Sequence, residues 1–209
     1  DEALQVIYNN VKTSSTATLS FSLQTYDGAT LLGTSDTVNK TLNINDSLPS
    51  IGMISYLDTN STTTAITSNN QYIIRNKSTL QVTINSLTAI NGATLRSINI
   101  AGAGINQTQT LSGTSENATF NLGTINQSNN FTLTATLTDS RGFTTTKTIN
   151  ISVWDYVAPT ATVAAARQDN YYSDTDVTVN ANYSSLGGNN TITITAGYKV
   201  NGSSGSYTT

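Results

Sequence analysis

The sequence predicts an all-β protein built from tandem Ig-like antiparallel β-sandwich modules, and three observations carry that prediction. Apolar residues alternate with Thr, Ser, Asn or Gln along many short runs, and turn sequences separate those runs. Charged residues make up only 10% of the chain, against roughly 25% in ordinary soluble domains. A strand with one apolar and one polar face packs on a single core and keeps its other face in water, as in antiparallel sandwiches.

Strands are expected wherever the apolar residues keep a period of two. The runs with this period are, in chain order, ATLSFSLQT, TLQVTIN, ATFNLG, FTLTATLT, KTINISVWD, DVTVNAN and NTITITAGY. The turns between them are YDGA, INGAT, AGAGIN, LSGTSEN, DSRG and LGGNN, all rich in residues that favour turns. In LRSINI the alternation of Leu95, Ile98 and Ile100 slips once, which predicts a β-bulge. No run has the period of an amphipathic helix, so no helix is expected.

An internal repeat divides the chain at its two prolines, Pro49 and Pro159. Lys-Thr-Leu-Asn-Ile precedes the first proline and Lys-Thr-Ile-Asn-Ile the second, at a separation of about 110 residues, the size of a sandwich of roughly seven strands. Three further pairs keep the same order: LSFSLQTYDG with LTATLTDSRG, LQVTINS with DVTVNAN, and NGATLRSINI with GNNTITITAG.

The repeat predicts three domains. Residues 1–48 are expected to be the C-terminal strands of a preceding Ig-like module, residues 49–157 a complete sandwich, and residues 158–209 the N-terminal part of a following module. The terminal parts are expected to be completed by further sequence, by each other or by neighbouring chains. At the module joint, proline begins a strand without continuing the previous ladder, because its φ is fixed and it has no amide hydrogen. Trp154 and Tyr156 are expected to pack there through their aromatic area.

Two long stretches resemble a family of minor structural proteins of tailed bacteriophages, often of uncharacterised function, from phages of Gram-positive hosts. The hallmarks are IIRNKSTL, DSRG before a Thr-rich strand, and APTATVAAARQDNYYSDT at the start of the next module. The resemblance covers most of residues 49–200 and, more loosely, the first 48. It implies a string of Ig-like sandwiches in a tail fibre, tail tip or similar virion appendage, and it implies no catalytic residues.

Composition excludes several classes of function. The chain has no histidine and no cysteine, which removes Ser-His and Cys-His nucleophilic machinery, disulfides and most zinc sites. Its formal net charge of −3, without a cluster of Lys and Arg, argues against nucleic-acid binding. No stretch approaches the roughly 20 apolar residues that span a bilayer. Twelve acids, mostly in turns, do not indicate the paired carboxylates of a glycosidase, so no enzymatic activity is expected.

The sequence offers candidate residues for two kinds of binding site, a calcium site and a glycan site, and each set of residues also has a structural alternative. Calcium needs clustered oxygen ligands, and the carboxylates that could supply them near module joints are Asp139, Asp155, Asp169, Asp174 and Asp176. The alternative is turn-forming Asp, and no cofactor is expected. A host glycan could stack on exposed aromatic rings, with Tyr171, Tyr172 and Tyr156 as the main candidates; the other aromatics considered are Tyr8, Tyr26, Tyr56, Tyr72, Trp154, Tyr183 and Tyr198. Core and boundary packing is the favoured role for most of these rings.

The remaining charged residues are expected to have structural roles. An Arg75–Asp pair or an Arg141–Asp139 pair is expected to cap a turn and to add little stability. Lys40, Lys77 and Lys147 are expected on polar strand faces, which argues against an intramolecular Lys–Asn isopeptide bond.

The sequence thus predicts a structural or adhesive segment of a bacteriophage tail fibre or other tail-associated virion protein, located outside the cell. Its expected partners are other virion tail proteins, further copies of itself and a host cell-surface glycan. The alternatives are the stalk of a bacterial surface adhesin and an accessory carbohydrate-binding module of a cell-wall hydrolase.

Overall fold

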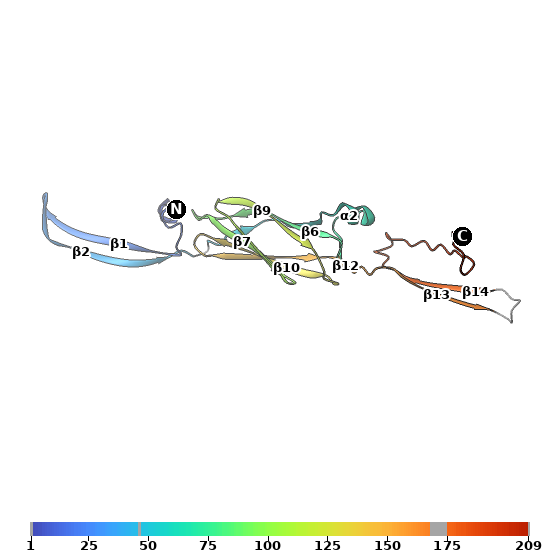
Figure 1. Cartoon of the computed structure of the whole chain (residues 1–209). Coiled ribbons are helices and arrows are strands. Elements are labelled where there is room, and N and C mark those ends of the chain that lie inside the picture. The colour runs from blue at the N-terminus through green and yellow to red at the C-terminus, as the bar shows by residue number, and fades with distance from the viewer. Residues whose placement is uncertain (1, 46, 168–174, 209) are drawn as a thin grey trace.

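The computed structural model describes residues 2–45, 47–167 and 175–208, and these residues form an elongated, mostly β structure. A central sandwich lies between two long two-stranded hairpins that extend from its opposite ends (Figure 1). The all-β prediction is confirmed, because antiparallel sheets make up each of these three parts.

The central sandwich consists of two facing sheets. In the first sheet β6 pairs with all the other strands, which are β3 (Ser50–Ile51), β4 (Ile54–Asp58) and β9 (Ser115–Thr124), while β6 itself spans Thr79–Thr88. The second sheet has the order β11-β10-β7-β8, with β7 at Leu95–Gly102, β8 at Ile105–Thr110, β10 at Phe131–Asp139 and β11 at Thr144–Ile151. A short parallel pair, β5 (Ile73–Ile74) and β12 (Val153–Trp154), lies at the end that leads into the next hairpin.

The core lies between these two sheets. Val82 and Ile84 of β6 and Leu133 and Leu137 of β10 are fully buried in a single apolar cluster. The intervening Thr, Asn and Gln residues point the other way, as the period of two predicts. The predicted bulge is confirmed: Ser97 is opposite Thr138 and Leu95 is opposite Asp139, so β7 carries one extra residue there.

The terminal hairpins have no second sheet among the described residues. The first pairs β1 (Thr16–Asp27) with β2 (Thr30–Asn43), and the second pairs β13 (Thr160–Arg167) with β14 (Thr175–Asn182). Their apolar residues alternate as predicted, yet most are exposed. The structure does not test whether these hairpins belong to further modules, so the predicted boundaries at 48 and 157 stay a prediction.

The strand expected in NTITITAGY is absent from the described chain. Residues 191–197 have no regular structure, and only an isolated bridge joins Tyr198 to Thr208. The corresponding strand of the central sandwich, β7, is held between β10 and β8. Residues 191–197 have no such neighbours, and an alternating run forms a strand only when another strand satisfies its backbone groups.

The expectation of no helix is wrong, because the chain forms α1 (Glu2–Asn10) and α2 (Ser61–Thr67). Local capping explains α2 better than any apolar stripe. The Asn60 side chain accepts a hydrogen bond from the Thr62 amide, and Ser68 ends the helix in the left-handed conformation with φ of 51°. None of the helices in the described part of the chain is long and apolar enough to cross a membrane.

The turn between β8 and β9 is held by the carboxyl group of Glu116, the second residue of β9. Glu116 Oε1 accepts hydrogen bonds from the amides of Gly113 and Ser112, and these bonds hold the pKa of Glu116 below its ordinary value. Hydrogen bonds to the ionised form favour ionisation.

We expect this turn to give the fold a small dependence on acid. Because the folded pKa of Glu116 is lowered, its contribution to stability is present above the unfolded value of about 4.3 and is lost as pH falls through the folded pKa. A carboxyl carbon titration by NMR measures the shift. The stability difference between the wild type and Glu116→Gln should shrink as the pH is lowered. A Glu116 pKa at or above that of a glutamate in a short peptide would contradict this account.

Candidate functional site at the two ends of the sandwich

Arg141 builds the junction between the sandwich and the N-terminal segment. It lies in the DSRG turn after β10, and only 7% of its surface is exposed. Its Nε donates to the Val11 carbonyl at 2.7 Å, and its Nη2 donates to the carbonyls of Tyr8, at 3.0 Å, and Asn91. Its Nη1 lies 3.4 Å from the Ile90 carbonyl. One guanidinium therefore joins the end of α1 to a loop of the sandwich.

The chemistry of this contact follows from the helix end. The last carbonyls of a helix have no partner within the helix and carry partial negative charge, so a cation there is stabilising. The Tyr8 ring adds to this, with its centroid 5.9 Å from the guanidinium carbon of Arg141. Gly92 permits the approach: its φ is +77°, and a Cβ at this position would lie 2.8 Å from the Tyr8 carbonyl oxygen.

The predicted Arg141–Asp139 pair is therefore wrong as an ion pair. Asp139 Oδ1 accepts from the backbone amides of Arg141, at 3.0 Å, and Phe143, at 2.8 Å, so this buried carboxylate shapes the turn. The guanidinium points away from it, toward α1. A carboxylate at the start of a turn commonly bonds the backbone ahead of it, and that frees Arg141 for the junction.

Trp154 builds the junction at the other end of the sandwich. Its ring stacks on Tyr72, with centroids 4.1 Å apart and an interplanar angle of 18°. Gly187 of the following segment lies against it, because a Cβ on Gly187 would be 2.7 Å from Trp154 Cη2. The Ser184 hydroxyl accepts a hydrogen bond from the Val157 amide at 2.8 Å. The linker and the segment after β14 are therefore both tied to the sandwich end.

The salt bridge at this end is the Arg75–Asp pair that the sequence suggested, with Asp155 as the acid. Arg75 Nη1 and Asp155 Oδ1 are 3.0 Å apart, and both side chains are about half exposed. Arg75 Nε also donates to the Asn126 carbonyl at 3.0 Å. Exposed pairs of this kind contribute about 0–1 kcal/mol. The aromatic contact, not the ion pair, dominates the junction.

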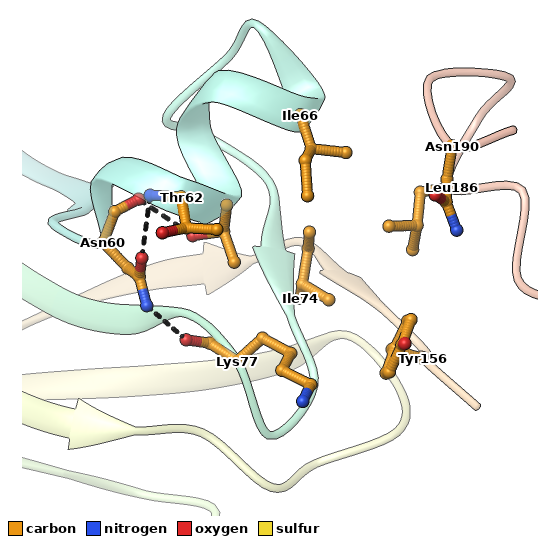
Figure 2. A pocket seen from close by; sticks show the side chains of 9 residues that line it. Asn60, Thr62, Ile66, Ile74, Lys77, Tyr156, Leu186 and Asn190 are labelled. Atoms are coloured by element: carbon orange, nitrogen blue, oxygen red, sulfur yellow. Dashed lines mark hydrogen bonds between the residues drawn. The ribbon is translucent and has the colours of Figure 1, made fainter. Parts of the chain in front are cut away.

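A cavity of about 370 Å³ lies beside this junction. Figure 2 shows Ile66 of α2, Ile74 of β5 and Leu186 pointing into it from different segments. The polar group nearest the helix is already used: Asn60 accepts from the Thr62 amide and donates to the Lys77 carbonyl (Figure 2). The cavity therefore has apolar walls and few polar groups free to recognise a ligand.

Tyr156, a candidate for glycan stacking, lines this cavity. Lys77 Nζ lies 5.3 Å from the centroid of its ring, so a cation occupies a position over the ring that a sugar would need. Of the other candidates, Tyr171 and Tyr172 lie outside the described residues. The remaining aromatics divide between the junctions, the half-buried Tyr56 and exposed positions at Tyr26, Tyr183 and Tyr198.

The structure does not bring the calcium candidates together. Asp139 holds its turn, Asp155 pairs with Arg75, and Asp176 lies on β14, while Asp169 and Asp174 fall outside the described residues. In the part of the chain that is described, no three His, Cys, Asp or Glu residues are grouped so as to hold a metal ion. Calcium at a joint therefore stays a prediction.

The prolines lie where each junction passes into a strand. Pro49 directly precedes β3, and Pro159 directly precedes β13. The Pro49 carbonyl also accepts a hydrogen bond from the Thr145 hydroxyl of β11 at 2.5 Å. Pro49 is buried, whereas Pro159 is exposed. The first joint is therefore fastened to the sandwich more closely at its proline than the second.

Lys40 and Lys147 do not lie on the polar strand faces where the sequence predicts them. Lys40 is opposite Leu19 and Lys147 is opposite Ala135, so both lie on the apolar face of their hairpin. Both are exposed: Lys147 because its long side chain extends past the edge of the core, and Lys40 because no described residue covers that face of its hairpin. Lys147 Nζ donates to the Gly52 carbonyl of the facing sheet. The three lysines considered for an isopeptide bond are all exposed, and that bond needs a buried lysine.

The fold and its junctions define a β-sandwich protein that is fixed to the segments on both sides of it. A family model described as "Siphovirus protein of unknown function (DUF859)" matches residues 6–207. The chain belongs to this family of siphovirus proteins, which confirms the predicted phage origin at that level. No curated protein matches the chain significantly. The Gram-positive host and the Ig-like character of the modules stay predictions.

Sequence analysis missed two contributors to these junctions. The turn glycine Gly187 matters because φ is +69° and Trp154 leaves no room for a side chain. For Arg141 the sequence predicts a pair with Asp139 in the same turn and gives no indication of the contact with α1. The signal in the sequence is the basic residue within the turn DSRG, because turns usually carry neutral polar residues at such positions.

Replacing Gly187 by valine should therefore open the C-terminal junction. A β-branched residue at positive φ costs about 1–2 kcal/mol, and its Cβ would also collide with the indole. Trp154 is the only tryptophan, so its emission should shift to longer wavelength as the ring becomes hydrated. Gly188→Val is the matched control, because φ there is +88° but no atom lies within 4 Å of a Cβ. Equal emission shifts in both variants would show that backbone strain alone accounts for the effect.

Proposed function

We propose that the chain is a structural segment of a siphovirus tail appendage, in which β-sandwich modules joined by packed junctions space or present a host-binding part. One observation carries this proposal: both ends of the sandwich are fixed to the flanking segments by side-chain contacts rather than by a free linker. Arg141 bonds to the carbonyls at the end of α1, and Trp154 stacks on Tyr72 and lies against Gly187.

The surface of the chain supports a role outside the cell. The outward strand faces carry Thr, Ser and Asn in place of charged residues, with hydrogen bonds between neighbouring strands such as Thr132 to Asn150 at 2.7 Å. Virion parts are exposed for long times, so slow unfolding matters more than equilibrium stability. Sheets built from distant segments, such as β6 with β9 and β7 with β10, fold slowly, and slow unfolding can accompany this topology.

The role that we propose is non-catalytic. The sequence offers neither histidine nor cysteine, and Asp139 and Glu116 each hold a turn while Asp155 pairs with Arg75. The family match favours a phage protein over a bacterial adhesin stalk. If the segment were instead an accessory module of a hydrolase, the purified chain would bind peptidoglycan or glycans. Binding to a glycan array that is lost on replacing Tyr156 would favour that alternative.

Immunogold electron microscopy of purified phage particles tests the proposal. Antibodies raised against residues 50–157 should label the tail, and adding the purified chain should abolish that label. Partly disrupted particles serve as a second sample, because they expose components hidden in the intact tail. Label confined to material outside the particles, with intact and disrupted tails both unlabelled, would overturn the proposal.

A further inference from the structure

The two terminal hairpins each leave an apolar sheet face uncovered. On β1–β2 one face carries Leu19, Phe21, Leu23 and Val38 together with the charged Lys40 and Asp36, and Leu23 is 71% exposed. The other face of the same hairpin carries only polar residues from Thr16 to Ser22 and from Thr37 to Asn43. A face that gathers the apolar residues, opposite a face that is entirely polar over these ranges, is typical of a strand pair that covers a core. Here the core side has no partner among the described residues.

The β13–β14 hairpin has the same division. Ala161, Val163 and Ala165 share one face with Val177 and Val179 of the neighbouring strand. Val163 is 68% exposed, although valines at such positions are ordinarily buried. The two hairpins extend from opposite ends of the molecule, so one chain cannot bring these two faces together while the sandwich lies between them (Figure 1).

The central sandwich shows how two such hairpins pack. Its β4–β6 pair faces its β10–β11 pair across a single core. Val-Thr-Ile-Asn in β6, at residues 82–85, corresponds to Val-Thr-Val-Asn in β14, at 177–180. Lys-Thr-Ile-Asn-Ile, at 147–151, corresponds to Lys-Thr-Leu-Asn-Ile, at 40–44. The exposed β13–β14 and β1–β2 hairpins are therefore counterparts of the two halves that pack on each other within the same chain.

Polar contacts and strand edges agree with this correspondence. Lys147 reaches across the sandwich to the Gly52 carbonyl. Lys40 has the same place on its own hairpin, where it could donate to a carbonyl near the start of β13. In addition, among the described residues β1 pairs only with β2, and residues 191–197 carry an alternating run outside any strand, with Ile192 and Ile194 exposed. The counterpart of this run, β7, pairs with β10, the counterpart of β1.

We propose that the β13–β14 hairpin and residues 191–197 of one copy pack on the β1–β2 hairpin of a second copy, so that two copies together form a further sandwich. The inference rests on the modular architecture in the proposed function and names one partner for it. The contact joins two different surfaces and therefore does not close on itself, so copies add head to tail into linear assemblies. A second copy is the partner that carries the matching half of the repeat.

Sedimentation velocity of the full 209-residue chain over a wide concentration range tests this. The wild type should form species that grow in mass with concentration. Two double variants each block one face: Phe21→Asp with Leu23→Asp, and Val163→Asp with Val177→Asp. Each variant alone should stay at the 22.1 kDa of one copy. Their equal mixture should stop at a dimer, because only one intact pair of faces remains.

Matched controls lie on the polar faces of the same strands. Ser20→Asp with Ser22→Asp, and Thr178→Asp with Asn180→Asp, each add the same two charges to the same hairpin and should leave assembly unchanged. Circular dichroism and Trp154 emission establish that each variant keeps the sandwich. A wild type that remains a monomer throughout, or a mixture of the blocked variants without dimers, would overturn the inference. Neither result would affect tail labelling, and unlabelled tails would not affect assembly in solution, so the two proposals can fail separately.

Discussion

Replacing Asp58 by alanine is expected to lower the free energy of unfolding of the central sandwich by about 3 kcal/mol or more. Asp58 is the last residue of β4 and is 3% exposed. Its Oδ1 accepts from the amides of Asn60 and Thr79, each at 2.9 Å. Its Oδ2 accepts from the hydroxyls of Thr63 and Ser78. One carboxylate thus joins β4, the start of α2 and the start of β6.

The size of the effect follows from what alanine leaves behind. Removing the carboxylate would leave the buried Ser78 hydroxyl and the half-buried amides of Asn60 and Thr79 without this acceptor, while the Thr63 hydroxyl would keep the Asn60 carbonyl. Each unsatisfied buried group costs about 1–3 kcal/mol before relaxation. Asp58→Asn should cost less, because its amide oxygen still accepts hydrogen bonds. Urea denaturation followed by circular dichroism measures both.

Asp155→Asn is the control for removing the charge of an aspartate at the same end of the sandwich. It breaks only the half-exposed pair with Arg75 and should cost less than about 1 kcal/mol. If Asp58→Ala unfolds at the same urea concentration as the wild type, the network does not stabilise the sandwich. The side-chain network would then be a consequence of the fold and not one of its supports.

The strands of the sandwich could be predicted from the sequence because a single pattern, the alternation of apolar and polar residues, determines them. Leu133, Ala135 and Leu137 alternate with threonines, and the alternation alone places them on the core side of β10. The bulge in β7 was likewise visible as a slip in phase before Ile98. Both features depend on near neighbours in the sequence and on burial of one sheet face, so no distant contact had to be known.

The helices and the junctions were not accessible because distant or capping contacts decide them. The α2 sequence STTTAIT has no apolar stripe, and Asn60 and Asp58 fix its start. The direction of the Arg141 side chain depends on carbonyls in α1, about 130 residues earlier in the chain. The run at 191–197 showed the converse: a strand pattern without a neighbouring strand remains irregular.

The junctions also explain how a chain so poor in charge uses the charges that it has. Arg141 binds a helix end, Arg75 holds the linker at Asp155, and Lys147 bonds to a carbonyl of the facing sheet. All three contacts tie separate elements together. These three charged side chains therefore connect separate parts of the protein, while hydroxyl and amide groups hydrate the outward strand faces.

Replacing Arg141 by methionine should therefore release the N-terminal segment while the sandwich stays folded. Hydrogen bonds to charged groups contribute about 1.5–3 kcal/mol each and do not add fully. We expect the opening free energy of residues 2–11 to fall by about 2–4 kcal/mol. The sandwich should keep most of its stability, because Asp139 binds the backbone amide of residue 141 and not its side chain. Amide hydrogen exchange resolves the two regions and measures the change in each.

Two further variants separate the geometry of the guanidinium from its charge. Arg141→Lys keeps the cation but should not restore protection of residues 2–11, because a single ammonium cannot span the Tyr8, Val11 and Asn91 carbonyls that the planar fork reaches. Arg96→Met removes an exposed arginine of β7 whose carbonyl accepts from the Leu111 amide, a bond that does not depend on the side chain, and it should change nothing at the N-terminus. Full protection of α1 in the lysine variant would mean that charge at the helix end suffices. Unchanged protection in Arg141→Met would mean that the junction is held by packing alone.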